Sequence, residues 1–263
     1  MGKLHDKWSF ETYLRYLREG RGQGEGLDYL PWLTTHTVPS NGIVYRVVGE
    51  KTGRIHHLLS NHEYRFFLLL DHDDNVLDIR EQFPLTLKDT MRISEKLGIR
   101  HPVINGFPYV LTCDFLITTK NGLLARTVKM TQDLKKERVI EKFNIEATLW
   151  RELEIDWKIV TEKEINIIKA DNLEWLYNGA SARELIHDDT VLRRSKTAFL
   201  QLYSRPDISF WSCIDIIEES FGLTSGTGIA LFKSLVREKS ISLDLNSKIN
   251  FTDPRKSFQS SWL

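Results

Sequence analysis

The chain has 263 residues, of which 41% are hydrophobic and 27% are charged, enough for one large core or two ordinary ones. Lys and Arg together number 36, as do Asp and Glu, so the formal net charge is zero and a basic surface needs local clustering. The longest apolar run, Phe66 to Leu70, is too short to cross a bilayer, and the N-terminus is too polar for a signal peptide. The two cysteines, Cys113 and Cys213, have the spacing of neither a disulfide framework nor a metal site. We therefore expect a soluble cytoplasmic protein without membrane association.

The N-terminal part of the chain alternates between helix and strand patterns. An amphipathic helix is expected over 8–19, followed by a glycine-rich connector over 20–26 that lacks the ending of a phosphate-binding loop. Ser60 and Glu63 form the Ser-x-x-Glu pattern that opens a helix, here over 60–70. Strand formers and an Asn-Gly hairpin turn predict strands over 43–48, 76–82, 101–105, 109–118, 123–130 and 157–160, with a long helix over 132–153.

This order of elements predicts an α/β domain over 1–168, built on a mixed sheet with helices on its faces. The remainder, 169–263, is expected to be a winged-helix-like α+β domain, although a plain helical bundle shares much of its pattern. Its last residues, 257–263, form a polar tail with an apolar end, suited either to docking on a partner or to disorder. The domain has helices predicted over 173–178, 182–186, 190–203, 208–220 and 228–239, and strands over 241–245 and 248–251.

The hairpin over 109–130 carries the most informative polar residues. Asp114 lies in an otherwise apolar strand, where a carboxylate is costly unless it is paired, metal-bound or at a solvent-facing strand end. On the returning strand, Thr127 and Lys129 share one face, and the turn can bring both close to Asp114. An aspartate on one strand and residue-x-lysine on the next is the core of the PD-(D/E)xK nuclease pattern. A salt bridge between Asp114 and Lys129 explains the same spacing.

The nuclease interpretation has a clear physical basis. Carboxylates hold one or two Mg²⁺ ions, which neutralise a phosphate and lower the pKa of the attacking water. A lysine orients that water or stabilises the charge that develops on the phosphorus centre. Glu63 either completes the helix cap or adds a metal ligand. Glu146 lies within the apolar stripe of the long helix, so it either forms a salt bridge with Lys129 or Arg138 or supports an active site.

Several cations are candidates for contacts with DNA phosphates. Arg21, Arg54 and Arg65, together with Lys129, are the residues that we assign to DNA binding, while a solvated surface explains the arginines equally well.

Longer blocks of the sequence resemble the TnsA family, the endonuclease subunits of heteromeric TnsA–TnsB transposases. The blocks keep their order and spacing from about residue 20 to about residue 178. They are Arg21-Gly-Gln-Gly, Asp28-Tyr-Leu-Pro-Trp-Leu, Lys51-Thr-Gly-Arg-Ile-His-His-Leu-Leu-Ser, Leu77-Asp-Ile-Arg-Glu-Gln-Phe-Pro-Leu, Gly98-Ile-Arg-His-Pro-Val, Asp114-Phe-Leu, Glu137-Arg-x-x-Glu-Lys, Glu164-Ile-Asn and Glu174-Trp-Leu-Tyr.

The resemblance implies a restriction-endonuclease-like N-terminal domain and a role for each polar residue singled out above. It implies that Glu63 and Asp114 bind metal, that Lys129 is the catalytic lysine, and that Glu146 supports the site. Thr127 stands where the family usually has Glu or Gln. It offers a hydroxyl or its backbone carbonyl to a metal, but no carboxylate.

The implied reaction is hydrolysis of phosphodiester bonds at the 5′ ends of a transposon during cut-and-paste transposition. The implied cofactor is Mg²⁺, two ions per site, with Mn²⁺ able to substitute. The implied partners are double-stranded DNA at the transposon ends, a separate TnsB-like transposase and a TnsC-like AAA+ ATPase. Two alternatives stay open: another nuclease of the same fold, and a non-catalytic assembly factor that binds DNA.

Overall fold

The computed structural model describes residues 8–37 and 42–255. The chain divides into two compact units, Met1–Ile165 and Asn166–Leu263. The predicted tail over 257–263 lies outside the described residues. Across the described ranges, no helix is both long enough and apolar enough to cross a membrane.

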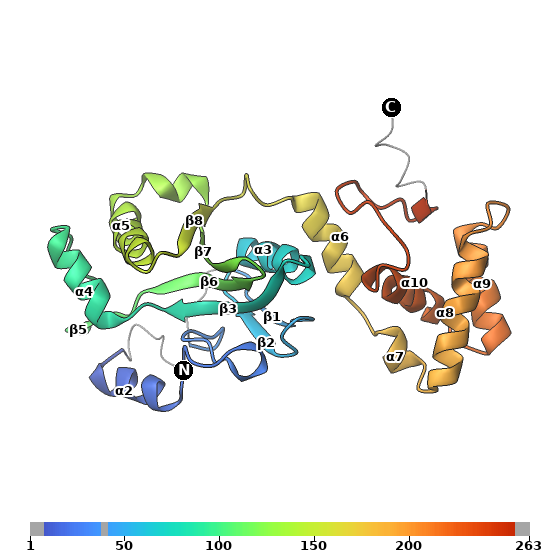
Figure 1. Ribbon diagram of the computed structural model, residues 1–263, viewed down its shortest axis with the longest axis horizontal. Helices are drawn as coiled ribbons and strands as arrows, with labels where there is room; N and C mark the ends of the chain where they lie inside the picture. The colour runs from blue at the N-terminus through green and yellow to red at the C-terminus, as the bar shows by residue number, and fades with distance from the viewer. Residues whose placement is uncertain (1–7, 38–41, 256–263) are drawn as a thin grey trace. The chain divides into compact units, whose positions relative to one another are not determined.

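The first unit is built on a four-stranded mixed sheet (Figure 1). The strand order is β3-β6-β7-β8, with antiparallel pairing between the first three strands and parallel pairing between the last two. The predicted mixed sheet flanked by helices is therefore confirmed. The four strands are β3 (Val76–Pro84), β6 (Thr112–Thr119), β7 (Gly122–Val128) and β8 (Asp156–Val160).

Helices and short hairpins surround this sheet. The predicted helices are present as α2 (Phe10–Arg18), α3 (Asn61–His72) and α5 (Glu137–Glu152), with a 3-10 turn, η2 (Thr131–Lys135), at the start of the last one. A further helix, α4 (Leu87–Lys96), was not predicted. The remaining short elements are η1 (Gly26–Asp28), β1 (Tyr45–Val48), β2 (Ile55–Leu58), β4 (Val103–Ile104) and β5 (Phe107–Pro108).

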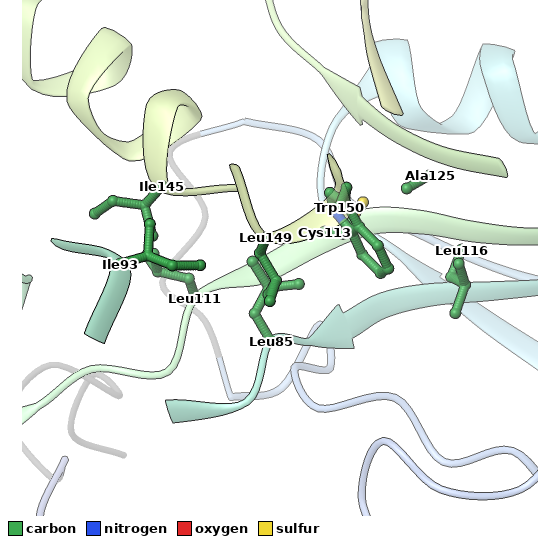
Figure 2. Packing of buried hydrophobic residues seen from close by; sticks show 9 residues of the cluster. All are labelled: Leu85, Ile93, Leu111, Cys113, Leu116, Ala125, Ile145, Leu149 and Trp150. Atoms are coloured by element: carbon green, nitrogen blue, oxygen red, sulfur yellow. The ribbon is translucent and has the colours of Figure 1, made fainter. Parts of the chain in front are cut away.

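The main core of this unit lies between the sheet and the pair α4 and α5. Ile145 and Leu149 are four residues apart on α5, so they lie on the same face, where Ile145 meets Ile93 of α4 in a cluster that extends to Leu116 of β6 (Figure 2). This packing fixes α5 against the strands that carry the polar residues of the hairpin. The full cluster comprises Leu85, Ile93, Leu111, Cys113, Leu116, Ala125, Ile145, Leu149 and Trp150.

In the described residues of the second unit, the regular secondary structure is helical. Phe199, Phe210 and Phe232 pack in its core. The rings of Phe210 and Phe232 lie edge to face, with their centroids 4.9 Å apart. Its helices are α6 (Ile167–Tyr177), α7 (Ala182–Leu185), α8 (Asp189–Tyr203), α9 (Phe210–Phe221) and α10 (Thr227–Arg237).

The strands predicted over 241–245 and 248–251 are wrong, because this segment is irregular. Two of its carbonyls accept hydrogen bonds from a side chain and not from a neighbouring strand. The side-chain amide of Asn172 on α6 donates to the carbonyls of Leu245 and Ser247, each at 2.8 Å. Ile241, Leu245 and Ile249 are buried. Apolar residues at intervals of four anchor the segment to the helices instead of to a second strand.

Candidate active site

A buried and a half-buried carboxylate from different elements meet at one end of the sheet. Glu63 lies in the first turn of α3 and Asp114 near the start of β6. The side-chain amide nitrogen of Gln82 lies between them, 3.2 Å from Oε2 of Glu63 and 3.4 Å from Oδ1 of Asp114. The structure thus brings two of the three predicted catalytic residues together through a third side chain.

Glu63 is held by the start of its own helix. Ser60 is the N-cap residue, and its hydroxyl accepts from the amide of Glu63 and donates to Oε1 of Glu63 at 2.9 Å. Oε2 accepts from the backbone amide of Leu59 at 2.9 Å. The capping and site interpretations are therefore compatible, because the contacts that fix the helix start also orient the carboxylate toward Gln82.

Asp114 connects β6 with the end of β7. Its Oδ2 accepts from the backbone amide of Val128 at 2.7 Å. The next residue, Lys129, continues the parallel pairing, since its amide donates to the carbonyl of Val160 at 2.9 Å. The Lys129 side chain is 37% exposed, and its Nζ lies 3.9 Å from a carboxylate oxygen of Asp133. Lys129 thus lies beside Asp114 along the backbone without a close ion pair between the two side chains.

Gln82 was not among the predicted site residues. Its φ is +49°, in the left-handed region that non-glycine residues seldom occupy, and it interrupts the pairing of β3 with β6 between Glu81–Phe115 and Phe83–Cys113. The carbonyl of Gln82 accepts from the amide of Trp32 at 3.2 Å, outside the sheet. The irregular strand turns a buried amide side chain toward the acid pair.

Among the described residues, no cation forms an ion pair with Glu63 or Asp114. Burial, followed by the nearby charge of Asp114, raises the pKa of Glu63 to about 8. Burial also raises the pKa of Asp114 to about 6, against the lowering effects of the Val128 amide and the Lys129 charge. Carboxylate oxygens are the ligands that Mg²⁺ prefers, and a bound cation would stabilise both groups in their ionised forms. The donor set therefore fits a hard divalent cation.

The described residues include no cluster of three or more His, Cys, Asp or Glu side chains arranged to hold a metal. A cation at the acid pair would complete its shell with water and with backbone or amide oxygens, as Mg²⁺ commonly does.

The side chain of Thr127 is engaged away from the acid pair, and metal binding by this residue, through its hydroxyl or its backbone carbonyl, stays a prediction. Its hydroxyl donates to Oε1 of Glu146 at 2.6 Å and accepts from the indole nitrogen of Trp157 at 3.3 Å. Both residues are buried, and burial raises the pKa of Glu146 to about 7. Glu146 also accepts from the indole nitrogen of Trp150 at 3.4 Å. Neither salt bridge predicted for Glu146 is formed, because Arg138 pairs with Glu141 at 2.6 Å and Lys129 lies nearest Asp133.

Arg54 has a structural role, which corrects its assignment to DNA binding. The residue is 7% exposed, and its guanidinium donates to both carboxylate oxygens of Glu81, at 2.8 and 2.5 Å. Nδ1 of His56 lies 2.8 Å from the same carboxylate. A guanidinium enclosed in this way is not available to a phosphate.

The other predicted DNA-binding arginines differ in exposure. Arg21 pairs with Glu19 at 2.7 Å and lies over the ring of Tyr16, 3.6 Å from its centroid, so most of its side chain is covered. Arg65 is partly exposed on α3, two residues after Glu63. Arg65 and Lys129 remain the DNA contacts that we propose from this set.

Comparisons with known proteins agree with the resemblance in the sequence. Residues 73–162 match the model of the TnsA-like endonuclease N terminal domain, and residues 164–245 match that of the TnsA endonuclease C terminal domain. The transposon Tn7 transposition protein TnsA of Escherichia coli is 46% identical over 181 residues, which is 68% of this chain and 66% of that protein. The chain, with the Glu63–Asp114 pair in its first unit, therefore belongs to the TnsA endonuclease family.

Proposed function

We propose that this protein is a metal-dependent DNA endonuclease that hydrolyses phosphodiester bonds at the 5′ ends of a transposon. The carboxylates of Glu63 and Asp114, joined by Gln82 and short of positive charge, carry the proposal. The match of both units to TnsA endonuclease models supports it. Mg²⁺, with Mn²⁺ as a substitute, is the cation that this donor set favours.

Each residue of the site has a role in this proposal. Glu63 and Asp114 would hold the cation, which when bound neutralises phosphate charge and acidifies a water molecule. Lys129, exposed at the end of β7, is placed to donate to a phosphate oxygen or to the attacking water. Gln82 keeps the two carboxylates aligned. Glu146 holds Thr127 and thereby the end of β7 against α5.

We propose partners for the same reaction. The Escherichia coli relative is a transposon Tn7 transposition protein. By extension, this chain acts on double-stranded DNA at transposon ends together with a TnsB-like transposase, which would process the 3′ ends, and a TnsC-like AAA+ ATPase. The zero net charge fits a nuclease whose partners provide most of the DNA targeting.

The decisive experiment is cleavage of end-bearing DNA in a mixture of this protein with its neighbouring transposase and ATPase. Wild type should produce Mg²⁺-dependent 5′ nicks, and Asp114→Ala should lose them while it retains native circular dichroism. Asp156→Ala, which removes an exposed aspartate of β8, is the control and should cut normally. Absence of nicks from wild type under every condition would contradict the proposal and favour a non-catalytic assembly role. Efficient cutting of plain duplex by the isolated chain would point to a different nuclease of this fold.

A further inference from the structure

A cavity of about 540 Å³ opens between α5 and the segment that leads from α4 into β5. It is lined by Arg100, His101, Pro102, Val103, Ile104, Tyr109, Arg138, Glu141 and Lys142. The core cluster that contains Ile93 and Ile145 packs α4 against α5, the helix that carries the lining residues Arg138, Glu141 and Lys142 (Figure 2). The walls are therefore set by packed elements of the first unit.

The cavity carries more positive than negative charge. Arg138 pairs with Glu141, the one carboxylate in the lining, at 2.6 Å. Within residues 8–37 and 42–255, Arg100 and Lys142 form no ion pair, so two cations are left without a counterion. His101 is engaged by its neighbours, because Nδ1 lies 3.0 Å from the carbonyl of Pro102 and Nε2 lies 3.1 Å from the hydroxyl of Thr90.

Lys142 lies in an environment that disfavours its own charge. Its pKa is lowered by burial and then by the charges of Arg138 and Lys129. Its surface is nevertheless open to solvent, because it faces the cavity and not the core. A bound anion would relieve this crowding of cations.

We propose that this cavity is a phosphodiester-binding subsite, in which Arg100 and Lys142 hold a backbone phosphate of the DNA strand at a position away from the scissile phosphate. The assignment rests on the proposed endonuclease function and adds a substrate contact to it. Arg100 offers a planar donor set and Lys142 a point charge, and both groups suit phosphate. The Pro102 to Ile104 wall is apolar and suits the deoxyribose next to that phosphate.

The first test measures binding of the full-length chain to a fluorescent end-sequence duplex by anisotropy, in Ca²⁺ and over a series of salt concentrations. Arg100→Gln and Lys142→Gln should each weaken binding several-fold at low salt. Each should lower the slope of log K against log salt by about one, as expected for loss of one phosphate contact. The matched controls are Arg151→Gln at the end of α5 and Lys120→Gln at the turn between β6 and β7, which is distant from Asp114. Unchanged slopes, or equal losses in the controls, would overturn the subsite.

The second test identifies the contact within the strand. Single phosphates are replaced by neutral methylphosphonates, and cutting in the transposase mixture is compared for wild type and Lys142→Gln. At one position, the two changes should be non-additive, because both remove the same contact. Additive effects at every position would overturn the inference even when wild type cuts normally. Failure of wild type to cut would instead count against the proposed function, and the salt slopes would still decide the subsite.

A free anion is the other source of the same chemistry. Inorganic phosphate alone should raise the unfolding midpoint of wild type less than the duplex does. If phosphate stabilises wild type but not Arg100→Gln, and no methylphosphonate position couples to Lys142, the cavity is a small-anion site and the assignment to DNA is wrong.

Discussion

The Gln82 side chain reaches the acid pair only because its backbone adopts a left-handed conformation within a strand. Such conformations cost about 1–3 kcal/mol and persist where surrounding contacts enforce them. Here Trp32 and Thr112 supply those contacts, through the carbonyl and the side-chain oxygen of Gln82 respectively. Local strain and the geometry of the site are therefore linked at one residue.

Replacing Gln82 by Leu should destabilise the metal-free protein by about 1–3 kcal/mol, because the carboxylates of Glu63 and Asp114 lose their shared donor. Mg²⁺ should recover part of this loss, since a bound cation would supply the missing positive charge. Urea unfolding in EDTA and in Mg²⁺ measures both effects. Gln132→Leu changes an exposed glutamine of η2 and should have little effect. An unchanged midpoint for Gln82→Leu would show that the amide does not support the pair.

Replacing Arg54 by Gln should cost about 3–5 kcal/mol, because the carboxylate of Glu81 would stay buried without its main partner. The unfolding free energy, measured in urea at neutral pH, checks this value. Arg46→Gln is the control, since Arg46 lies exposed on β1. A small effect at Arg54 would return this residue to the set available for DNA.

The same ion pair predicts how stability depends on pH. Burial alone would raise the pKa of Glu81, but hydrogen bonds from Arg54 and His56 outweigh it and lower the pKa to about 2. A glutamate in the unfolded chain has a pKa of about 4.3. The contribution of Glu81 is therefore fully present above this value and is lost as the pH falls toward 2. Unfolding midpoints between pH 2 and 6 should fall more steeply for wild type than for Glu81→Gln, and parallel curves would contradict the assignment.

Elements with strong periodic or capping signals were predictable, whereas those that depend on tertiary contacts were not. Ser60 and Glu63 mark the start of α3 in the sequence, and the hairpin places Asp114 near the end of β7. Helix α4 is the exception, because its residues are clearly amphipathic, with Thr90, Ile93 and Ser94 on the buried face, and it was still not predicted. No pattern reveals that Gln82 has a positive φ or that Arg54 is buried, since both depend on partners distant in the sequence. In the segment over 241–251, apolar and polar residues alternate as in a strand, but the side-chain amide of Asn172 donates to two of its carbonyls.

Capping at α8 tests the helical character of the second unit. Asp188 accepts from the amides of Thr190 and Val191 at 2.7 and 3.1 Å, so Asp188→Ala should destabilise this unit by about 0.5–2 kcal/mol. The adjacent variant Asp189→Ala removes an equal charge, together with its ion pair to Arg183, without removing the cap. Thermal unfolding followed by circular dichroism should show a larger shift for Asp188→Ala. Equal shifts would indicate a simple charge effect.

The molecule as a whole combines balanced charge with local sites of one sign. Its zero net charge and pI of about 7.1 predict a solubility minimum near neutral pH, because intermolecular repulsion is weakest there. Precipitation by polyethylene glycol at pH 6, 7.1 and 8.5 should require the least precipitant at the middle value. A steady trend across the three values would show that local patches, and not the net charge, govern association.

Both thiols of the chain are shielded, and this has a practical consequence. Cys113 and Cys213 are fully buried, and burial raises the pKa of each, so little thiolate forms at neutral pH. The native protein should therefore resist maleimide reagents without removal of either cysteine. A single cysteine introduced as Ile140→Cys, at an exposed position of α5 next to the lining residue Glu141, would then be the point of attachment for a fluorophore, and its emission would report the arrival of a DNA strand at the cavity in real time.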